Sequence, residues 1–298
     1  MALAIRGCGT AIVSPFDERG KLDFGALERI VEWQIQQRID FLVTCTPVGE
    51  SPALSGDERR AVTAHVVKTA DRRVPVLAGA GGNHTAKSVF WARDAEKAGA
   101  DAILSALPYY NHPTLDGLAK HYGAIADATR VPIFLYNLPD RTGTDLPVEM
   151  LLRLAEIPRI AGLVDASGDF GRLAAATARV ADGFVFLAGD DRTALSALAL
   201  GMSGLVSVAA NEVPAEMRAM VDAALADRWE EARGIFRKYL PLFEANCLES
   251  VPGPVKAALS LMGKSSETLR LPLASVREET RRRIEKVLRS LKLLPKSR

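Results

Sequence analysis

Short apolar runs alternate along the chain with longer stretches in which apolar residues recur at helical spacing. The short runs predict eight strands, at residues 9–16, 41–45, 74–80, 101–107, 131–137, 160–167, 184–190 and 204–210. Several of them are apolar throughout instead of alternating with polar residues. That pattern is typical of strands buried on both faces of a parallel sheet.

The amphipathic stretches between these runs predict helices near residues 23–38, 56–70, 85–98, 114–128, 147–156, 170–181, 191–200 and 214–225. Two helix starts carry recognisable signals. Ser55 precedes a charged segment, and Thr144 with Asp145 precedes a helix whose first turn suits Pro147. These signals favour one helix start after Ser55 and another at residue 147, shortly after Thr144 and Asp145.

Eight strand–helix units within residues 1–225 predict a (β/α)8 TIM barrel of the α/β class more readily than a doubly wound sheet. Three further helical stretches follow, near 227–247, 253–262 and 272–292. No linker rich in Pro, Gly or Ser separates them from the barrel, so we interpret residues 226–298 as a C-terminal helical appendage. The basic run at its end is expected to be a helix that packs inward through Ile284, Val287, Leu288 and Leu291.

The composition of the chain gives no support to several classes of function. The chain has 298 residues, 48% of them hydrophobic and 25% charged, with a net charge of +2, which gives no reason to expect nucleic acid or a membrane surface as partner. No apolar run approaches the ~18 residues of a membrane span, and the N-terminal stretch with Arg6 is interpreted as a strand, not a signal peptide. Cys8, Cys45 and Cys247 lie far apart, without metal-ligand spacing, and indicate reduced thiols in the cytoplasm.

In a barrel of this kind the chemistry lies on the loops that follow the strands. Tyr136 ends the fifth predicted strand and Tyr110 follows the fourth; the two phenols either form a proton relay or pack with their hydroxyls satisfied. Arg141, in the loop "PDRTG", either clamps a carboxylate or is a solvated surface charge. Residue type alone favours the structural alternative in each case.

Other side chains at strand ends suggest no metal and no cofactor. "GAGGN" lacks a following Lys-Ser/Thr and is not a phosphate loop. Asp190 and Asp191 are adjacent, so their carboxylates point apart, and helix N-capping fits them better than metal binding. No ligand spacing links the histidines, which we interpret as surface or cap residues: His84, His112 and His121.

Six segments in order carry a resemblance to a known family: "TAIVSPFDERGKLDFGAL" (10–27), "PYYNHPTLDGLAKHY" (108–122), "FLYNLPDRTG" (134–143), "DASGD" (165–169), "AGDD" (188–191) and "PGPVKAALSLMG" (252–263). Over nearly its whole length the chain resembles the dihydrodipicolinate synthase/N-acetylneuraminate lyase family. "YNLPDRTG" and "PVKAALSLMG" resemble the synthase branch, in which the arginine matching Arg141 holds the carboxylate of aspartate semialdehyde.

The resemblance implies a pyruvate-dependent class I aldolase. Pyruvate forms an imine with a lysine that ends the sixth strand, and the imine lets the methyl carbon lose a proton and attack an aldehyde. Tyr136 would shuttle the proton, and Tyr110 would reach a neighbouring subunit's site in a homotetramer built as a dimer of dimers. The implied substrate-binding positions are Pro47, Val48, Gly49, Glu50, Arg141, Gly189 and Val206.

The chain departs from the family at the residues that perform this chemistry. "GLVDASGD" aligns without a gap to the pattern G-[IL]-K-[ED]-[AS]-[ST]-G-D, so Val164 stands where the lysine belongs. Pro47 and Val48 replace two threonines that carry a relay hydroxyl and help to bind the pyruvate carboxylate. Valine has no nitrogen and cannot form an imine. None of the lysines lies on a predicted strand end: 21, 68, 87, 97, 120, 238, 256, 264, 286, 292 and 296.

Three functions remain open. The chain is a synthase homologue with little or no imine turnover, a lyase or hydratase that polarises a small keto acid without an imine, or a non-catalytic assembly partner of an active paralogue. In each, Tyr136, Arg141 and Asn211 are expected at the mouth of the pocket. Lys87 stands where lysine-inhibited synthases carry an acidic residue, so we expect no lysine feedback.

Overall fold

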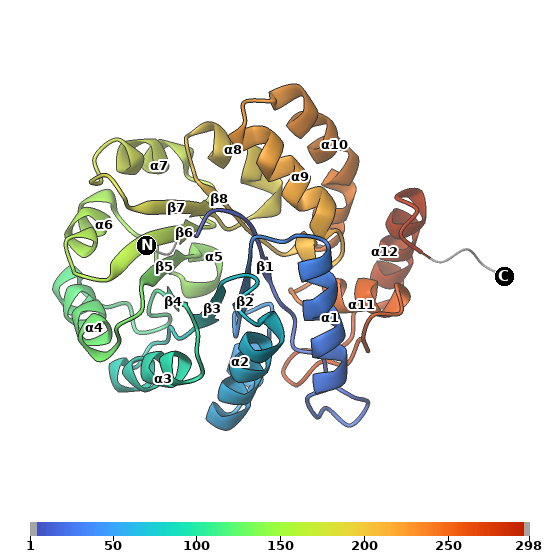
Figure 1. Ribbon diagram of the computed structural model, residues 1–298, viewed down its shortest axis with the longest axis horizontal. Helices are drawn as coiled ribbons and strands as arrows, with labels where there is room; N and C mark the ends of the chain where they lie inside the picture. Colours follow the sequence, from blue (N-terminus) through green and yellow to red (C-terminus); the bar gives the residue numbers. More distant parts are fainter. Residues whose placement is uncertain (1–4, 295–298) are drawn as a thin grey trace.

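The computed structural model describes residues 5–294 and shows a closed barrel of parallel strands, in which β8 pairs back with β1 (Figure 1). The strands are β1 (Gly7–Ala11), β2 (Phe41–Thr44), β3 (Val76–Gly79), β4 (Ala102–Ala106), β5 (Ile133–Asn137), β6 (Ile160–Asp165), β7 (Val185–Ala188) and β8 (Gly204–Ser207). The predicted (β/α)8 TIM barrel is therefore confirmed.

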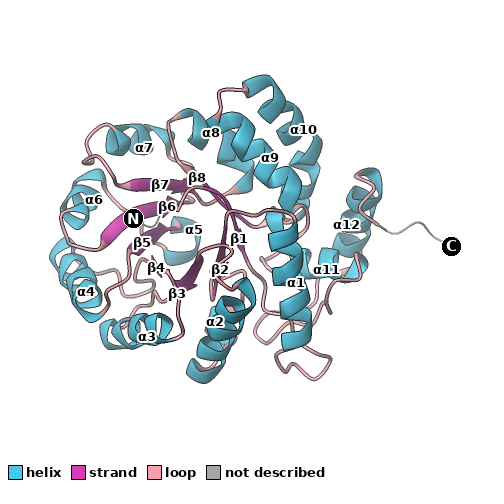
Figure 2. Ribbon diagram, in the orientation of Figure 1, coloured by secondary structure: helices cyan, strands magenta, loops and turns pink. Residues whose placement is uncertain are grey.

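Helices surround the strands on the outside of the barrel, except for the short α5, which Figure 2 shows inside this ring next to β5. They are α1 (Phe24–Gln36), α2 (Gly56–Ala70), α3 (Thr85–Lys97), α4 (Leu115–Ala128), α5 (Pro139–Thr142), α6 (Val148–Ala155), α7 (Phe170–Thr177), α8 (Ala194–Ala199), α9 (Pro214–Leu225), α10 (Trp229–Ala245), α11 (Gly253–Leu261) and α12 (Glu278–Ser290). Single 3-10 turns follow β2, β7 and β8: η1 (Ser51–Ala53), η2 (Asp191–Thr193) and η3 (Ala209–Asn211).

Both predicted helix starts agree with the structure to within one residue. Ser55 caps α2, and its hydroxyl and the Glu58 carboxylate form a reciprocal capping box. The other helix, expected from residue 147, begins at Val148 with Pro147 as its N-cap, so neither Thr144 nor Asp145 caps it. The residue before a proline is driven out of the helical region, so Leu146 cannot join the helix.

Other elements differ from the sequence prediction in their bounds, and one short helix was not predicted. β1 covers Gly7–Ala11 instead of 9–16. Residues 12–16 lie outside the sheet but are buried, so their apolar character reflects burial and not pairing with a neighbouring strand. The short helix α5 was not predicted, since a proline and a glycine bound only four residues. The last helix begins at Glu278 instead of 272.

The C-terminal helices pack against the side of the barrel that carries α1 and α9 (Figure 1). In α12, Ile284 and Leu288 are fully buried and Val287 and Leu291 are partly buried, as the sequence predicts. The division of the chain at 225/226 into barrel and appendage stays a prediction. Within residues 5–294, no helix has the length and apolar character needed to cross a membrane.

Candidate active site

A cleft opens where the strands of the barrel end. It has two lobes of about 700 and 670 Å³, and both are lined by Pro47, Tyr136, Leu138 and Arg141. Pro47 follows β2, Tyr136 lies in β5, and Leu138 and Arg141 lie on the loop and short helix after β5. Active sites of this fold lie at this end of the barrel, so the cleft is the candidate active site.

Val164 and Tyr136 are neighbours across the β5–β6 pair. Their Cα atoms are register partners, so their side chains lie on the same face of the sheet. Tyr136 lines both lobes, whereas Val164 is fully buried and lines neither. Burial raises the pKa of the Tyr136 phenol to about 12, so at neutral pH this side chain is a hydrogen-bond donor and not a base.

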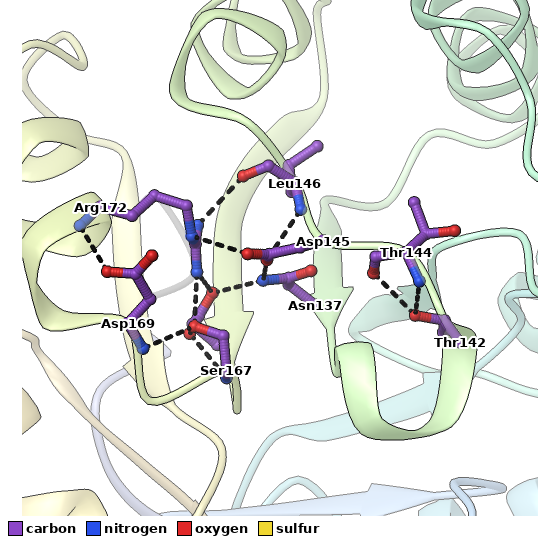
Figure 3. A network of polar contacts seen from close by, with 9 residues as sticks. Asn137, Thr142, Thr144, Asp145, Leu146, Ser167, Asp169 and Arg172 are labelled. Carbon is purple, nitrogen blue, oxygen red and sulfur yellow. Dashed lines mark hydrogen bonds and ion pairs between the residues drawn. The ribbon is translucent and has the colours of Figure 1, made fainter.

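A buried polar network surrounds the residue that follows Val164 (Figure 3). The Asp165 carboxylate accepts hydrogen bonds from Asn137 Nδ2 at 2.8 Å, from Ser167 Oγ at 2.6 Å and from Arg172 Nη2 at 2.5 Å. Asp145, which does not cap α6, accepts a further bond from Asn137 Nδ2 at 2.7 Å. This network ties the ends of β5 and β6 to the start of α7.

The backbone around Val164 is fixed on both sides. Ala166 N donates to Asn137 O at 2.8 Å, and Gly189 N donates to Asp165 O at 2.7 Å. A side chain at position 189 would place a Cβ 3.0 Å from Ala166 Cβ and 3.2 Å from Asp165 O, so it would crowd the end of β6. The chain therefore keeps a rigid support at the end of β6, although the residue it presents has no reactive group.

In the loop after β2, two residues line the cleft and the next two hold the loop in place. Pro47 and Val48 line the cleft and contribute no hydroxyl or charge. Gly49 and Glu50 line neither lobe: Gly49 O accepts a hydrogen bond from Ser14 Oγ at 2.7 Å, and Glu50 pairs with Lys256. Of these four positions, only the two apolar ones line the cleft.

Lys256 is a buried lysine whose role the sequence analysis missed. It reaches from α11 to Glu50 in a fully buried ion pair and also donates to Thr268 O at 2.9 Å. Burial lowers the pKa of its amine to about 8. Nothing in the sequence distinguishes it from a surface lysine of an amphipathic helix, and it lines neither lobe of the cleft.

The loops after β7 and β8 are held by carboxylates, as the capping interpretation predicts. Asp190 accepts from Arg192 N at 2.8 Å. Asp191 accepts from Ser207 Oγ at 2.6 Å and from Ala209 N at 2.8 Å. Gly189, Asp190 and Asp191 line the second lobe, while Val206 is buried in β8 and does not.

Two sequence expectations about side-chain positions are wrong. Asn211 is not at the mouth of the cleft: it is fully buried, and its amide joins Ala11 O and Val13 N of the first strand–loop segment to η3. His121 is neither exposed nor a cap, since it is buried in α4 with Nδ1 2.9 Å from Thr85 Oγ1. His84 caps α3 through Lys87 N as expected. Within residues 5–294 no group of His, Cys, Asp and Glu could hold a metal.

The Asp191 carboxyl is expected to make stability depend on pH. Burial raises its pKa to about 6, against about 4 in an unfolded chain. The contribution of Asp191 to the free energy of unfolding is therefore fully present below about pH 4 and is lost as the pH rises through 6. Between about pH 4 and pH 7, the wild-type free energy of unfolding should fall by about 3 kcal/mol relative to Asp191→Asn, measured by urea unfolding. The exposed Asp182→Asn is the control, and a pH-independent difference for Asp191→Asn contradicts the prediction.

These features define a class: a (β/α)8 barrel whose cleft, at the end of the barrel where active sites of this fold lie, is lined by a phenol and an arginine. The sequence model of the Dihydrodipicolinate synthetase family matches residues 4–291, and the chain belongs to this family of lyases.

Similar proteins extend this finding over almost the whole chain. A 4-hydroxy-tetrahydrodipicolinate synthase from Koribacter versatilis (strain Ellin345) is 47% identical over 96% of this chain and 95% of its own. The crystal structure of dihydrodipicolinate synthase from Aquifex aeolicus superposes with a TM-score of 0.96 at 34% sequence identity, covering 98% of this chain and 100% of its own. The crystal structure of the Acinetobacter baumannii synthase complexed with pyruvate superposes with a TM-score of 0.95 at 38% sequence identity, covering 98% of this chain and 100% of its own.

Proposed function

We propose that this chain is a 4-hydroxy-tetrahydrodipicolinate synthase homologue that binds a pyruvate-like 2-oxo acid in its cleft without forming an imine. The family reaction condenses pyruvate with aspartate semialdehyde in lysine biosynthesis, and this chain would have little or no such turnover. The observation that carries the proposal is Val164, which lies beside Tyr136 on a well-supported strand end and offers no amine.

The lysines near the cleft support this view. Lys87 lines the first lobe, but it lies exposed on α3 and not at the end of a strand. Lys256 is held by Glu50 behind the loop after β2 and lines neither lobe. Neither lies at the end of a strand, where an imine would adjoin Tyr136.

Arg141 and Tyr136 would bind the 2-oxo acid. Arg141 is exposed at the wall shared by both lobes and makes one long hydrogen bond, to Val251 O at 3.5 Å, so its guanidinium is free to hold a carboxylate. The protonated Tyr136 phenol would donate to the ketone oxygen. Pro47 and Val48 supply no further polar contact, so binding should be weaker than with hydroxyl groups at those positions.

The test is incubation with pyruvate and borohydride, followed by intact-mass measurement and calorimetric titration with pyruvate. We expect no mass gain, together with binding that Arg141→Gln weakens about tenfold and the exposed control Arg130→Gln leaves unchanged. A mass gain, or no binding at all, overturns the proposal. Turnover of pyruvate and aspartate semialdehyde without a mass gain would instead establish a lyase or hydratase that acts without an imine.

We also propose that the chain assembles as a cytoplasmic homotetramer, a dimer of dimers, to which Tyr110 contributes. Tyr110 is 87% exposed, has a positive φ of 73° and lines neither lobe of its own chain's cleft. An aromatic ring held outward in this way suits a contact with another subunit. Light scattering should give four chains, and Tyr110→Asp should give smaller species; a monomeric wild type would contradict the assembly.

Lysine is not expected to bind the first lobe. Lys87 and Arg59 line it together with Arg141, and they would repel the lysine ammonium group. Calorimetric titration of the wild type with lysine should therefore show no heat of binding. Binding that Asn83→Ala abolishes would contradict this prediction.

A further inference from the structure

The second lobe of the cleft has an apolar wall to which separate parts of the chain contribute. Its members are Val48 from the loop after β2, Val208 from the turn before η3, Phe243 from α10 and Val251 from the loop before α11. All four line the second lobe and not the first. Val48 and Phe243 are buried, whereas Val208 and Val251 are half-buried. An apolar group of a ligand that lies against this wall is removed from water, which favours binding.

The acidic side chains deep in this lobe are compensated by the protein itself. Asp190 forms an ion pair with Arg192 at 2.6 Å. Asp191 accepts three hydrogen bonds from the end of β8 and the two residues that follow it. Glu249 accepts from the Arg277 backbone N–H at 3.0 Å and lies 3.4 Å from the guanidinium of the same residue. These carboxylates therefore do not require a cationic ligand in the lobe.

The other charged residues of the lobe, Asp140 and Arg141, are exposed on α5. In the proposed function Arg141 holds the carboxylate of the 2-oxo acid and Tyr136 donates to its ketone oxygen. Both residues line both lobes, so the rest of the acid could extend into either one. The first lobe adds the cations Arg59 and Lys87, which an uncharged chain would separate from water at a cost. The apolar wall of the second lobe therefore suits an uncharged chain better.

We propose that the 2-oxo acid of this cleft carries a branched aliphatic chain, which lies against Val48, Val208 and Val251 in the second lobe. The lobe has a volume of about 670 Å³, which leaves room for such a chain beyond the carboxylate and the ketone. This inference rests on the proposed function, because it takes the places of the carboxylate and the ketone from it. It adds the class of acid, since the methyl group of pyruvate is too short to cover the wall.

Calorimetric titration of the full chain with a series of 2-oxo acids tests the proposal. The series is pyruvate, 2-oxobutanoate and 4-methyl-2-oxopentanoate, and we expect the last to bind at least about tenfold more tightly than pyruvate. The matched polar probe is 3-hydroxypyruvate, which has a hydroxyl group where 2-oxobutanoate has a methyl group. It should bind about threefold more weakly than 2-oxobutanoate. Equal affinities along the series, or tighter binding of 3-hydroxypyruvate, would overturn the inference.

Two valine variants test whether the wall is responsible for the preference. Threonine resembles valine in shape but adds a hydroxyl group, so Val48→Thr should reduce the preference for 4-methyl-2-oxopentanoate over pyruvate at least about threefold. Val251→Thr, at a half-buried position, should have the same effect and decides the question if Val48→Thr does not fold. The matched control is Val131→Thr, half-buried just before the start of β5, which should leave the preference unchanged. An equal effect of the control contradicts the role of the wall.

Arg141→Gln separates a failure of this inference from a failure of the proposed function. It should weaken pyruvate and 4-methyl-2-oxopentanoate by the same factor of about ten, because both acids carry the carboxylate. Pyruvate binding that depends on Arg141, without tighter binding of the branched acid, would overturn this inference and leave the proposed function standing. If none of the acids binds, both are overturned.

Discussion

Replacing Val164 with lysine is expected to let pyruvate become covalently trapped, which the wild-type chain does not allow. The amine would attack the ketone carbon, water would leave, and borohydride would reduce the imine to a stable secondary amine. Burial lowers the pKa of a lysine at such a position, which favours its neutral, nucleophilic form. Intact-mass measurement should show one reduced pyruvate adduct per Val164→Lys chain and none on the wild type.

This gain is expected because the residues that support position 164 are held in place. Asp165 is bonded to Asn137, Ser167 and Arg172, and Tyr136 lies beside position 164. The larger side chain should cost about 1–3 kcal/mol of stability. Adding Pro47→Thr and Val48→Thr should then raise any turnover of pyruvate with aspartate semialdehyde, because the hydroxyl groups of the loop are restored.

Val164→Met is the matched control for Val164→Lys. It has a long side chain but no amine, so it should show the same loss of stability and no adduct. If Val164→Lys folds, binds pyruvate and still gives no adduct, then position 164 does not face the substrate. The assignment of the imine position would be wrong in that case.

The fold could be predicted from the sequence because strand burial leaves a simple signal. Apolar runs bounded by turn residues marked every strand of the barrel, and their number and spacing pointed to its closure. This apolar pattern fails to predict a strand boundary where residues are buried but not paired with a neighbouring strand. Ile12 and Phe16 are apolar and buried yet lie outside β1, and no pattern in the sequence separates them from the strand.

The candidate site was predicted less completely, because its support depends on pairs of residues far apart in sequence. Asp165 and Arg172 were visible as charged residues, but only the fold shows that they pair at 2.5 Å. The buried ion pair between Lys256 and Glu50 likewise joins residues that are 206 positions apart in the sequence. The apolar wall of the second lobe also follows from which loops meet and not from the composition of any one segment.

Replacing Lys256 with methionine is expected to destabilise the protein by about 3–5 kcal/mol. The Glu50 carboxylate would remain buried without its ion-pair partner, and the Arg270 backbone N–H, at 3.0 Å, would be its remaining hydrogen-bond donor. Because the pair links α11 to the loop after β2, the loss should also loosen Pro47 and Val48 at the cleft. Urea unfolding measures the change, and Lys238→Met, an exposed lysine of α10, should fall within about 0.5 kcal/mol of the wild type.

The double variant Glu50→Gln/Lys256→Met decides whether the pair itself is stabilising or only costly to break. The neutral amide that Glu50→Gln introduces can still accept from the Arg270 N–H and leaves no uncompensated charge in the interior. We expect the double variant to regain most of the lost stability, to within about 1–2 kcal/mol of the wild type. A double variant as unstable as Lys256→Met alone would show that the lysine stabilises the appendage through packing against Phe16, 4.1 Å away, and not through its charge.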